Sequence, residues 1–193
     1  GVTIIRNLLD TRPQLPPGKF RDDTAQAIRE IPGVASASLV GLTRIKGNNH
    51  GQEEFFPVAA VDEHFWKMRG LTPHTGSLFG AQEVKERQRV IVLGKRLAQS
   101  LFGTEDVAGR TLELGHDVYQ VIGVVGGLRD IELEKSLFVP LSTGKDRYFH
   151  QIVWDRLYVR CATWDDVPTV AAAIPQAVAA HQSAENLLVE VSW

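Results

Sequence analysis

The stretch Arg89–Val125 constrains the fold of this chain most, because the patterns of a strand, a helix and a hairpin follow one another within it. Val90–Leu93 is an unbroken apolar run rich in β-branched residues, which is typical of a strand covered on both faces. From Lys95 to Phe102 the apolar residues form one helical stripe, and Gly103 stands where a left-handed C-terminal cap is expected. The first half of the stretch therefore predicts a buried strand followed by a short helix.

The second half of the same stretch predicts a β-hairpin. Thr111–Leu114 alternates apolar with polar residues, and Val118–Val125 is again rich in residues that favour strands. Gly115–Asp117 supplies turn residues between them, so the two strands most simply pair with each other. Together the two halves predict one compact α/β unit.

Both ends of the chain carry a strand–helix–strand pattern, with the stretch described above between them. The predicted elements are Val2–Ile5, Lys19–Ile31 and Val34–Ile45 at one end, and Ile152–Val159, a helix from Asp166 to Gln182 and Leu187–Val191 at the other. This arrangement predicts an α+β fold, a split βαβ platform into which a second subdomain is inserted. We place the platform at residues 1–61 and 152–193, and the inserted, smaller α/β subdomain at residues 62–151.

The segments between these elements are predicted from their turn residues. Gly47–Gly51 indicates a turn, after which Glu54–Val61 is expected to return as a strand along the previous one. Leu71–Gln88, with its prolines, glycines and charges, is expected to be a loop-rich surface. Leu137–Pro140 predicts a brief strand, and Gly144–Gln151 a polar linker.

The composition excludes some classes of protein. The 193 residues are 44% hydrophobic and 23% charged, which is ordinary for a globular protein. The net charge is −2 and the basic residues are scattered, so we expect no nucleic-acid partner. Cys161 is the one cysteine, and it is expected to act as a small buried apolar residue.

No apolar run approaches the roughly 18–20 residues that a membrane-spanning helix needs. The first ten residues also lack the pattern of a signal peptide. We therefore expect the chain as given to be soluble, with any targeting or membrane segments outside this sequence.

The motifs for chemistry are incomplete. Gly94 and Lys95 follow a strand as in a phosphate-binding loop, but the upstream glycine is missing and Arg96 replaces the hydroxyl residue. The six histidines show no metal-ligand spacing, and no nucleophile elbow is present. Asp62 with His64 resembles an acid–base pair, yet helix capping explains Asp62 more simply. We predict no catalytic, cofactor-binding or metal-binding residues.

One apolar and aromatic cluster is a candidate partner or substrate surface because it lies beside the loop-rich stretch. Core packing between the subdomains is the alternative, and we favour it because aromatic residues at short helical spacing usually face inward. The cluster consists of Phe65, Trp66, Met68, Leu78 and Phe79.

The order of several short motifs resembles that of the MacB-like periplasmic core domain, found in bacterial ABC transporter permeases of the MacB/FtsX type. The similar segments are Ile31–Val34, Glu63–Trp66, Gly76–Phe79, Val90–Gly94, Leu101–Gly103, Val107–Leu112, Val121–Val125 and Phe138–Pro140. The chain departs from the pattern at Trp66, Ser77 and Ala108. Each segment is short, so the resemblance depends on their order.

The resemblance implies a porter-like βαβ subdomain with an inserted smaller α/β subdomain, carried between transmembrane helices. It also implies a bacterial inner (cytoplasmic) membrane protein whose domain lies on the periplasmic or extracellular side. This domain would have no cofactor and no ATPase activity, because ATP and Mg²⁺ bind separate nucleotide-binding domains. The implied partners are the permease's own transmembrane helices, a cytoplasmic ATPase subunit or domain, a second permease copy or paralogue, and a periplasmic adaptor.

The implied function is to couple cytoplasmic ATP hydrolysis to substrate export or lipoprotein release by conformational motion. One alternative is an FtsX-like regulatory module that activates a cell-wall hydrolase. Another is an independent ligand-binding domain or small enzyme, which predicts a deep pocket with converging titratable groups. The permease interpretation requires the first and last residues to lie at the same end of the domain.

Overall fold

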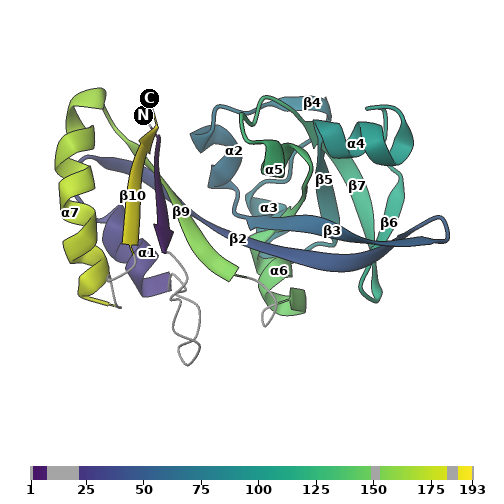
Figure 1. The fold of residues 1–193 in the computed structure, drawn as a ribbon, viewed down its shortest axis with the longest axis horizontal. Coiled ribbons are helices and arrows are strands. Elements are labelled where there is room, and N and C mark those ends of the chain that lie inside the picture. Colours follow the sequence, from purple (N-terminus) through teal and green to yellow (C-terminus); the bar gives the residue numbers. More distant parts are fainter. Residues whose placement is uncertain (1, 8–21, 149–152, 182–186, 193) are drawn as a thin grey trace. The chain divides into compact units, whose positions relative to one another are not determined.

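The computed structural model describes residues 2–7, 22–148, 153–181 and 187–192, and the chain divides into two compact units. Unit 1 comprises Gly1–Val40 and Val153–Trp193, and unit 2 comprises Gly41–Ile152. Helices and strands are both present in each unit, so the fold is α+β (Figure 1). Within the described ranges, no helix is both long and apolar enough to cross a membrane.

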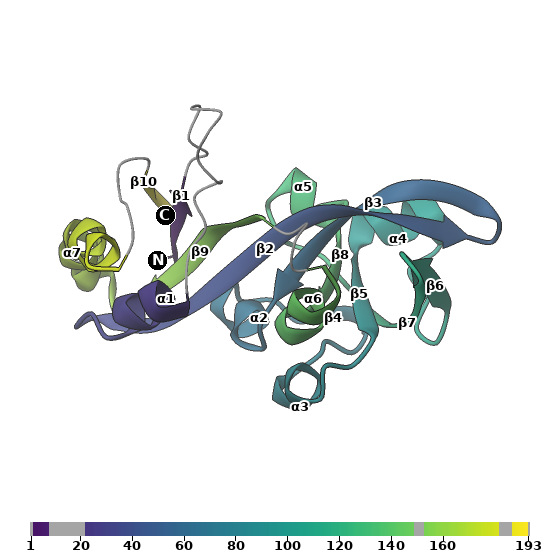
Figure 2. The ribbon, with the colours of Figure 1, turned by 90° about the horizontal axis from the view of Figure 1, so that it is seen from below.

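Unit 1 is a split βαβ fold made from the two ends of the chain. Its strand order is β10-β1-β9-β2, and β1 is antiparallel to both of its neighbours. The two helices, α1 and α7, contact each other on one side of these strands (Figure 2). The elements are β1 (Val2–Asn7), α1 (Asp22–Arg29), β2 (Val34–Asn49), β9 (Val153–Cys161), a 3₁₀ turn (Trp164–Asp166), α7 (Val167–Ala179) and β10 (Leu187–Ser192).

The core of unit 1 follows from the apolar stripes of its helices. Ile28 of α1 is fully buried, as are Val170, Ile174 and Val178 of α7, which recur at the three- and four-residue spacing of one helix face. Lys19–Arg21, Ile152 and Gln182, which belong to predicted elements, lie outside the described residues. The predicted strand–helix–strand pattern at each end is otherwise confirmed.

The two ends of the chain lie side by side in unit 1. Val2 at the start of β1 pairs with Ser192 at the end of β10 (Figure 1). On the other side of β1, Val2 pairs with Arg160 of β9. The first and last described residues, Val2 and Ser192, thus lie at the same end, as the permease interpretation requires of the chain ends.

The strands of unit 2 close into a ring. β2, β3, β8, β5 and β7 are successive neighbours, and β6 pairs with both β7 and β2. The edge strand β4 pairs with the last residues of β7, whereas β6 pairs with its first residues. The further elements of this unit are β3 (Gln52–Val61), α2 (His64–Met68), β4 (Pro73–Gly76), α3 (Ala81–Lys85), β5 (Val90–Gly94), α4 (Lys95–Phe102), β6 (Thr111–Leu114), β7 (Asp117–Val125), α5 (Ile131–Glu134), β8 (Leu137–Pro140) and α6 (Leu141–Tyr148).

The stretch that most constrained the sequence interpretation folds as predicted. β5 is buried along its whole length, α4 follows it directly, and β6 and β7 form the expected hairpin. Gly103 ends α4 in the left-handed conformation, with φ of 66°. β5 and β7 are also parallel neighbours in the ring, so this stretch supplies three of its strands.

Gly47 closes the ring, which makes the predicted turn at Gly47–Gly51 wrong for its first residues. β2 continues to Asn49, and Gly47 pairs with Leu114 of β6. A Cβ atom at Gly47 would lie 2.6 Å from the ring of Phe56 and 2.7 Å from the carbonyl oxygen of Glu113. Only a residue without a side chain lets β6 approach this closely, so the glycine serves strand pairing here.

The boundary between the units differs from the predicted one. β2 pairs with β3 from Gly41 onward, starting opposite Ala60, so the whole β2–β3 hairpin belongs to unit 2. The predicted platform segment 1–61 is therefore too long, and the inserted unit is the longer of the two rather than the smaller. The boundary between the units therefore lies within β2, where its pairing with β3 begins, and not after β3 as predicted.

Two stretches predicted without regular structure contain short elements. The segment Leu71–Gln88 includes β4 and α3, and the start of the predicted linker Gly144–Gln151 lies in α6. The rest of that linker, Phe149–Gln151, lies outside the described residues. Both corrections concern polar segments, whose structure depends on neighbouring elements more than on their own apolar pattern.

Candidate functional site

The predicted aromatic surface is part of the core of unit 2. Phe65, Trp66, Met68 and Phe79 are each at most 5% exposed, whereas Leu78 is half-buried. Trp66 Nε1 donates a hydrogen bond to the carbonyl oxygen of Phe79 at 3.0 Å. The surface interpretation is therefore wrong for these four residues. They form a core cluster within unit 2.

Aromatic edges and faces hold this core cluster together. The ring of Trp66 lies edge-to-face against Phe65, Phe79 and Phe138, with centroid distances of 5.3, 5.2 and 5.2 Å. Aromatic rings prefer this arrangement because the positive edge of one ring meets the negative face of the next. The cluster joins α2 to β8. Because its rings are buried, a partner cannot contact them.

The residues considered for acid–base chemistry have structural roles. Asp62 Oδ1 accepts a hydrogen bond from the backbone nitrogen of His64 at 3.0 Å, at the first residue of α2. His64 Nε2 lies 3.4 Å from Glu63 Oε1 at the surface. Cys161 is buried, and burial raises the pKa of its thiol, as expected for a packing residue. The capping interpretation of Asp62 agrees with this geometry.

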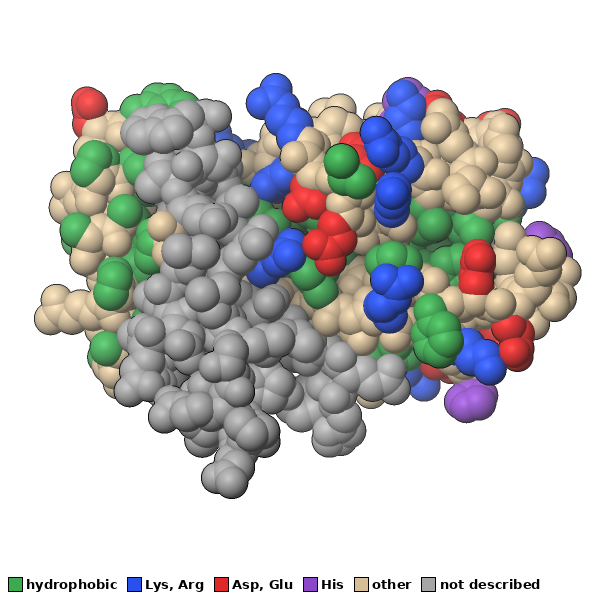
Figure 3. Space-filling view, viewed as in Figure 1, with side chains coloured by type: hydrophobic (Ala, Val, Ile, Leu, Met, Phe, Trp, Pro, Cys, Tyr) green, Lys and Arg blue, Asp and Glu red, His purple; other side chains and the backbone are tan. Residues whose placement is uncertain are grey.

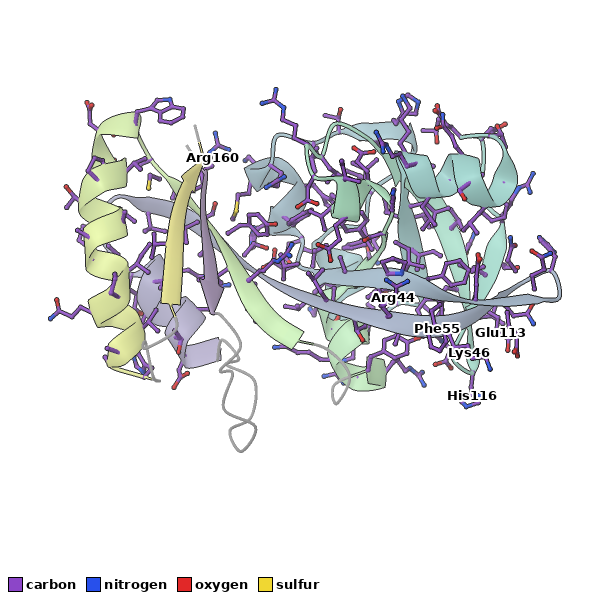
Figure 4. All side chains as sticks on the ribbon, in the orientation of Figure 1. Arg44, Lys46, Phe55, Glu113, His116 and Arg160 are labelled. Carbon is purple, nitrogen blue, oxygen red and sulfur yellow. The ribbon has the colours of Figure 1, made fainter. Side chains whose placement is uncertain are left out.

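A different site lies on the outer face of the β2–β3 hairpin. Ile45 pairs with Phe56 and both point into the core, at 3% and 1% exposure. The alternate residues Arg44, Lys46 and Phe55 point to the opposite, exposed face, where Lys46 pairs directly with Phe55. Figure 4 shows these three side chains together along the hairpin, with Glu113 and His116 beside them.

A groove of ≈ 610 Å³ runs beside this face, and we call it the hairpin groove. Its walls come from β2, β3, the turn between β6 and β7, and α6. A second hollow of ≈ 300 Å³ lies around Lys46 and Glu113. The hairpin groove is lined by Arg44, Ile45, Lys46, Phe55, Gly115, His116, Asp117, Asp146, Arg147 and Tyr148.

The carboxylates of the hairpin groove are already engaged by cations. Asp117 lies 3.2 Å from Arg89 Nη1 and 3.6 Å from Arg147 Nη1, and Asp146 lies 3.3 Å from Arg87 Nη1. Lys46 Nζ lies 3.1 Å from Glu53. Arg44 makes no hydrogen bond or ion pair within the part of the chain that the structure describes. The groove therefore offers one unengaged guanidinium beside an exposed aromatic ring.

Tyr148 lines the hairpin groove, and its hydroxyl group meets that of a second, buried tyrosine, Tyr119, behind it. The hydroxyl groups of Tyr119 and Tyr148 are 2.8 Å apart, and Tyr148 also donates to the carbonyl oxygen of Leu114 at 3.4 Å. Burial raises the pKa of both phenols, and for Tyr148 the hydrogen bond with Tyr119 adds to this effect. Both therefore stay protonated at neutral pH, so they contribute shape and hydrogen bonding but no charge.

The described residues of the groove provide the features of a binding surface. Among them His116 is the one imidazole, and none is a nucleophile with a base beside it. Among the described residues, no group of three or more histidine, cysteine, aspartate or glutamate side chains is placed to hold a metal ion. What the groove does supply is an exposed ring, cations and a recess, which are features of a docking surface.

Sequence reasoning missed Phe55, although a signal for it was present. Phe55 and Phe56 are adjacent in a predicted strand, so only one of them can face the core. Which one does so follows from the register with β2, where Ile45 opposite Phe56 is apolar and Lys46 opposite Phe55 is charged. Phe55 is consequently 61% exposed.

A polar cluster holds the edge strand β4 to the loop after α4. His74 Nε2 donates a short hydrogen bond to Glu105 Oε2, and Thr75 Oγ1 donates to the backbone carbonyl of Glu105 at 2.7 Å. Gln99 donates to the other carboxylate oxygen at 2.8 Å, and Lys95 Nζ lies 3.8 Å from that oxygen. The hydrogen bond from His74 holds the pKa of the Glu105 carboxyl below its usual range, with Lys95 and Gln99 acting in the same direction.

This cluster predicts a pH-dependent contribution to stability. Because the folded-state pKa of Glu105 is depressed, its stabilisation is present above the unfolded-state pKa and is lost as the pH falls through the folded-state value. We expect Glu105→Gln to lower the Tm at pH 7, and the difference from the wild type to shrink as the pH falls below about 4.3, the usual pKa of a glutamate, and to vanish below the lower folded-state pKa. Thermal unfolding from pH 7 down through the acid range measures this. Glu113→Gln is the control, since Glu113 is exposed and makes no ion pair among the described residues. An equal loss of Tm in Glu113→Gln would contradict the stabilising role of the Glu105 cluster.

Comparison with known families decides what kind of domain this is. The model of the MacB-like periplasmic core domain family matches residues 3–177, which is most of the chain. The chain belongs to that family. Several relatives carry the name macrolide export ATP-binding/permease protein MacB; among them, one from Chlorobaculum tepidum is 25% identical over 169 residues, and one from Marinobacter nauticus is 30% identical over 172 residues.

These alignments cover 81% and 85% of this chain but only 25% and 26% of the two relatives, so the chain spans about a quarter of their length. Solved structures show that the fold of this MacB-like domain is shared more widely. The periplasmic region of MacB from Actinobacillus actinomycetemcomitans superposes with a TM-score of 0.82 at 15% identity, covering 97% of this chain and 87% of that one. The extracellular domain of the noncanonic ABC-type transporter YknZ from Gram-positive bacteria gives 0.79 at 15% identity, covering 99% of this chain and all of that one.

Proposed function

We propose that this chain is the extracytoplasmic domain of a bacterial ABC transporter permease, where its motion couples cytoplasmic ATP hydrolysis to substrate export or lipoprotein release. The pairing of Val2 with Ser192 supports this most directly, because both ends must connect to helices in the same membrane. The family match and the export proteins among the relatives support the transporter class. The domain itself is proposed to be non-catalytic and to bind no cofactor.

The proposed setting is the inner (cytoplasmic) membrane, with this domain on the periplasmic or extracellular side. Its partners there are the permease's transmembrane helices, a cytoplasmic ATPase subunit or domain that binds ATP and Mg²⁺, a second permease copy or paralogue, and a periplasmic adaptor. Membrane sidedness is testable with Lys85→Cys, because Lys85 is exposed on α3 whereas Cys161 is buried. A membrane-impermeant maleimide should label Lys85→Cys in the intact permease of whole cells; labelling only after the inner membrane is broken would refute this orientation.

Mechanical coupling is supported by the way the chain connects the two units. β2 is one strand of 16 residues, of which Val34–Val40 belongs to unit 1 and Gly41–Asn49 to unit 2. Unit 2 has no chain end of its own, so any force applied through the ends of the chain enters unit 1 first. We infer that unit 1 receives the motion and that unit 2 presents it to a substrate or partner.

Excision of the domain from the intact permease tests this function. Because Val2 and Ser192 are paired neighbours, a short Gly-Ser linker can replace the intervening residues without separating the flanking segments. We expect ATP hydrolysis by the excised permease to persist, and at least one of two activities to be lost: ATP-dependent macrolide export from vesicles or lipoprotein release from spheroplasts. Full retention of both transport activities would refute the proposal, and loss of cell-wall hydrolase activation alone would establish the FtsX-like alternative instead.

A further inference from the structure

We propose that the outer face of the β2–β3 hairpin, with the hairpin groove beside it, is a docking site for an acidic segment of a partner protein. The site consists of Phe55 with Arg44 and Lys46 around it. This inference goes beyond the proposed function, since it concerns the chemistry of one surface and does not depend on coupling to ATP hydrolysis.

The apolar part of the argument is the exposure of Phe55. Its ring is 61% exposed although the adjacent Phe56 is 1% exposed, because the register with β2 turns Phe56 inward and Phe55 outward. An apolar side chain stands between basic side chains over this hairpin in the space-filling view (Figure 3). Aromatic and arginine side chains that a partner can bury together are the residues that most often dominate binding at protein interfaces.

Charge identifies the kind of partner. Arg44 and Lys46 are two residues apart on β2 and therefore project from the same face as Phe55. The acidic residues of the groove are held by other cations, namely Asp117 by Arg89 and Arg147 and Asp146 by Arg87. Arg44 is engaged by none of the described residues, so a carboxylate from outside is the group that complements it. A segment with an acidic residue next to an apolar one matches this surface.

The same charges argue against a lipid bilayer as the occupant. A membrane surface presents many negative charges over a wide area, and it is bound by clusters of lysine and arginine together with several apolar side chains. Here one exposed ring is accompanied by carboxylates at Glu53, Glu113, Asp117 and Asp146, which an anionic surface would also meet. A peptide segment can place its carboxylate at Arg44 and avoid those four positions.

Selection from random peptides displayed on phage tests the proposal on the 193-residue chain. We expect selected sequences to be enriched in aspartate or glutamate next to an apolar residue. Synthetic copies of them should bind the wild type and lose affinity as salt is raised, because exposed ion pairs are screened. We expect Arg44→Glu and Phe55→Ser each to weaken binding by about tenfold or more, as for central interface residues.

The controls are matched in charge and in exposure. Arg96→Glu makes the same charge change on α4, and Ile131→Ser removes another exposed apolar side chain, 63% exposed on α5. Both should leave peptide binding unchanged. All four side chains are exposed, so circular dichroism and thermal unfolding should show that each variant folds.

Several outcomes would overturn the proposal. These are selected peptides without acidic enrichment, peptides that bind Arg44→Glu as well as the wild type, or a loss of binding in the two controls that equals the loss in Arg44→Glu. Flotation with phosphatidylglycerol vesicles that depends on Arg44 and Phe55 would assign the face to a membrane. Sedimentation showing self-association that Phe55→Ser abolishes would assign it to a second copy of the chain.

Discussion

Trp66→Ala is expected to lower the free energy of unfolding by about 3–5 kcal/mol, the loss typical of truncating a large buried aromatic residue. Trp66 is 5% exposed, and its indole lies against three phenylalanine rings. Removing it leaves a cavity between α2 and β8 and leaves the carbonyl oxygen of Phe79 without its donor. Urea unfolding followed by far-UV circular dichroism measures the change, because the variant has lost a fluorophore.

Two variants separate this explanation from a general effect of losing an aromatic residue. Phe55→Ala removes a ring that is 61% exposed, so stability should change by no more than about 0.5 kcal/mol. Trp66→Phe keeps part of the ring packing and loses only the N–H donor and some volume, so its loss should lie between the other two. Equal stability of Trp66→Ala and Phe55→Ala would show that the aromatic cluster is not a core.

Gly94→Ala is expected to cost about 3 kcal/mol, at the upper end of what overpacking a core usually costs. A Cβ atom at Gly94 would lie 2.7 Å from the carbonyl carbon of Glu134 and 2.8 Å from the carbonyl oxygen of Leu133, and it would contact the oxygen of Glu134 more closely still. These are backbone atoms of α5, which cannot rotate away as a side chain can. Gly94 also donates a backbone hydrogen bond to the carbonyl oxygen of Ser136 at 2.8 Å, which the same displacement would stretch.

Gly80→Ala is the matched control for Gly94→Ala. Gly80 has an extended backbone with φ of −118°, and the nearest atom to an added Cβ is the flexible Glu83 carboxylate at 3.7 Å. Because Gly80 is the N-cap of α3, where alanine is less favourable than glycine, its substitution should cost no more than about 1 kcal/mol. A loss at Gly94 no larger than at Gly80 would mean that β5 and α5 do not approach as closely as the structure shows. The close approach also explains the glycine before Lys95 without any phosphate ligand.

Local pattern explains why the stretch from β5 to β7 was predictable. Burial on both faces of β5 requires a continuous apolar run, the stripe of α4 requires three- and four-residue spacing, and the reversal after α4 requires a residue that tolerates positive φ. Each requirement is met by residues within a few positions of one another, such as Gly103. The same reasoning predicted the elements of unit 1.

The candidate site was not predictable in the same way. Phe65, Trp66 and Phe79 have the composition of an interface, yet the structure buries them in one cluster with Phe138, which is far away in the sequence. Phe55 has the composition of a core residue, yet it is exposed because its partner across the hairpin is Lys46. Exposure depends in the first case on a ring that is distant in the sequence and in the second on the register of a hairpin, and composition reports neither.

Most of the helices and strands, the α+β class, the split βαβ arrangement of the chain ends and, through the order of the motifs, the family follow from the sequence alone. Those features depend on short-range spacing of apolar residues, glycines and prolines. Three features become visible only in the folded chain: the strands of unit 2 close into a ring at Gly47, the boundary between the units falls between Val40 and Gly41, and Phe55 rather than Trp66 faces solvent. These depend on pairing between strands far apart in the chain, such as β2 with β6 and β3 with β8, and a one-residue change in that register would exchange the buried and exposed faces.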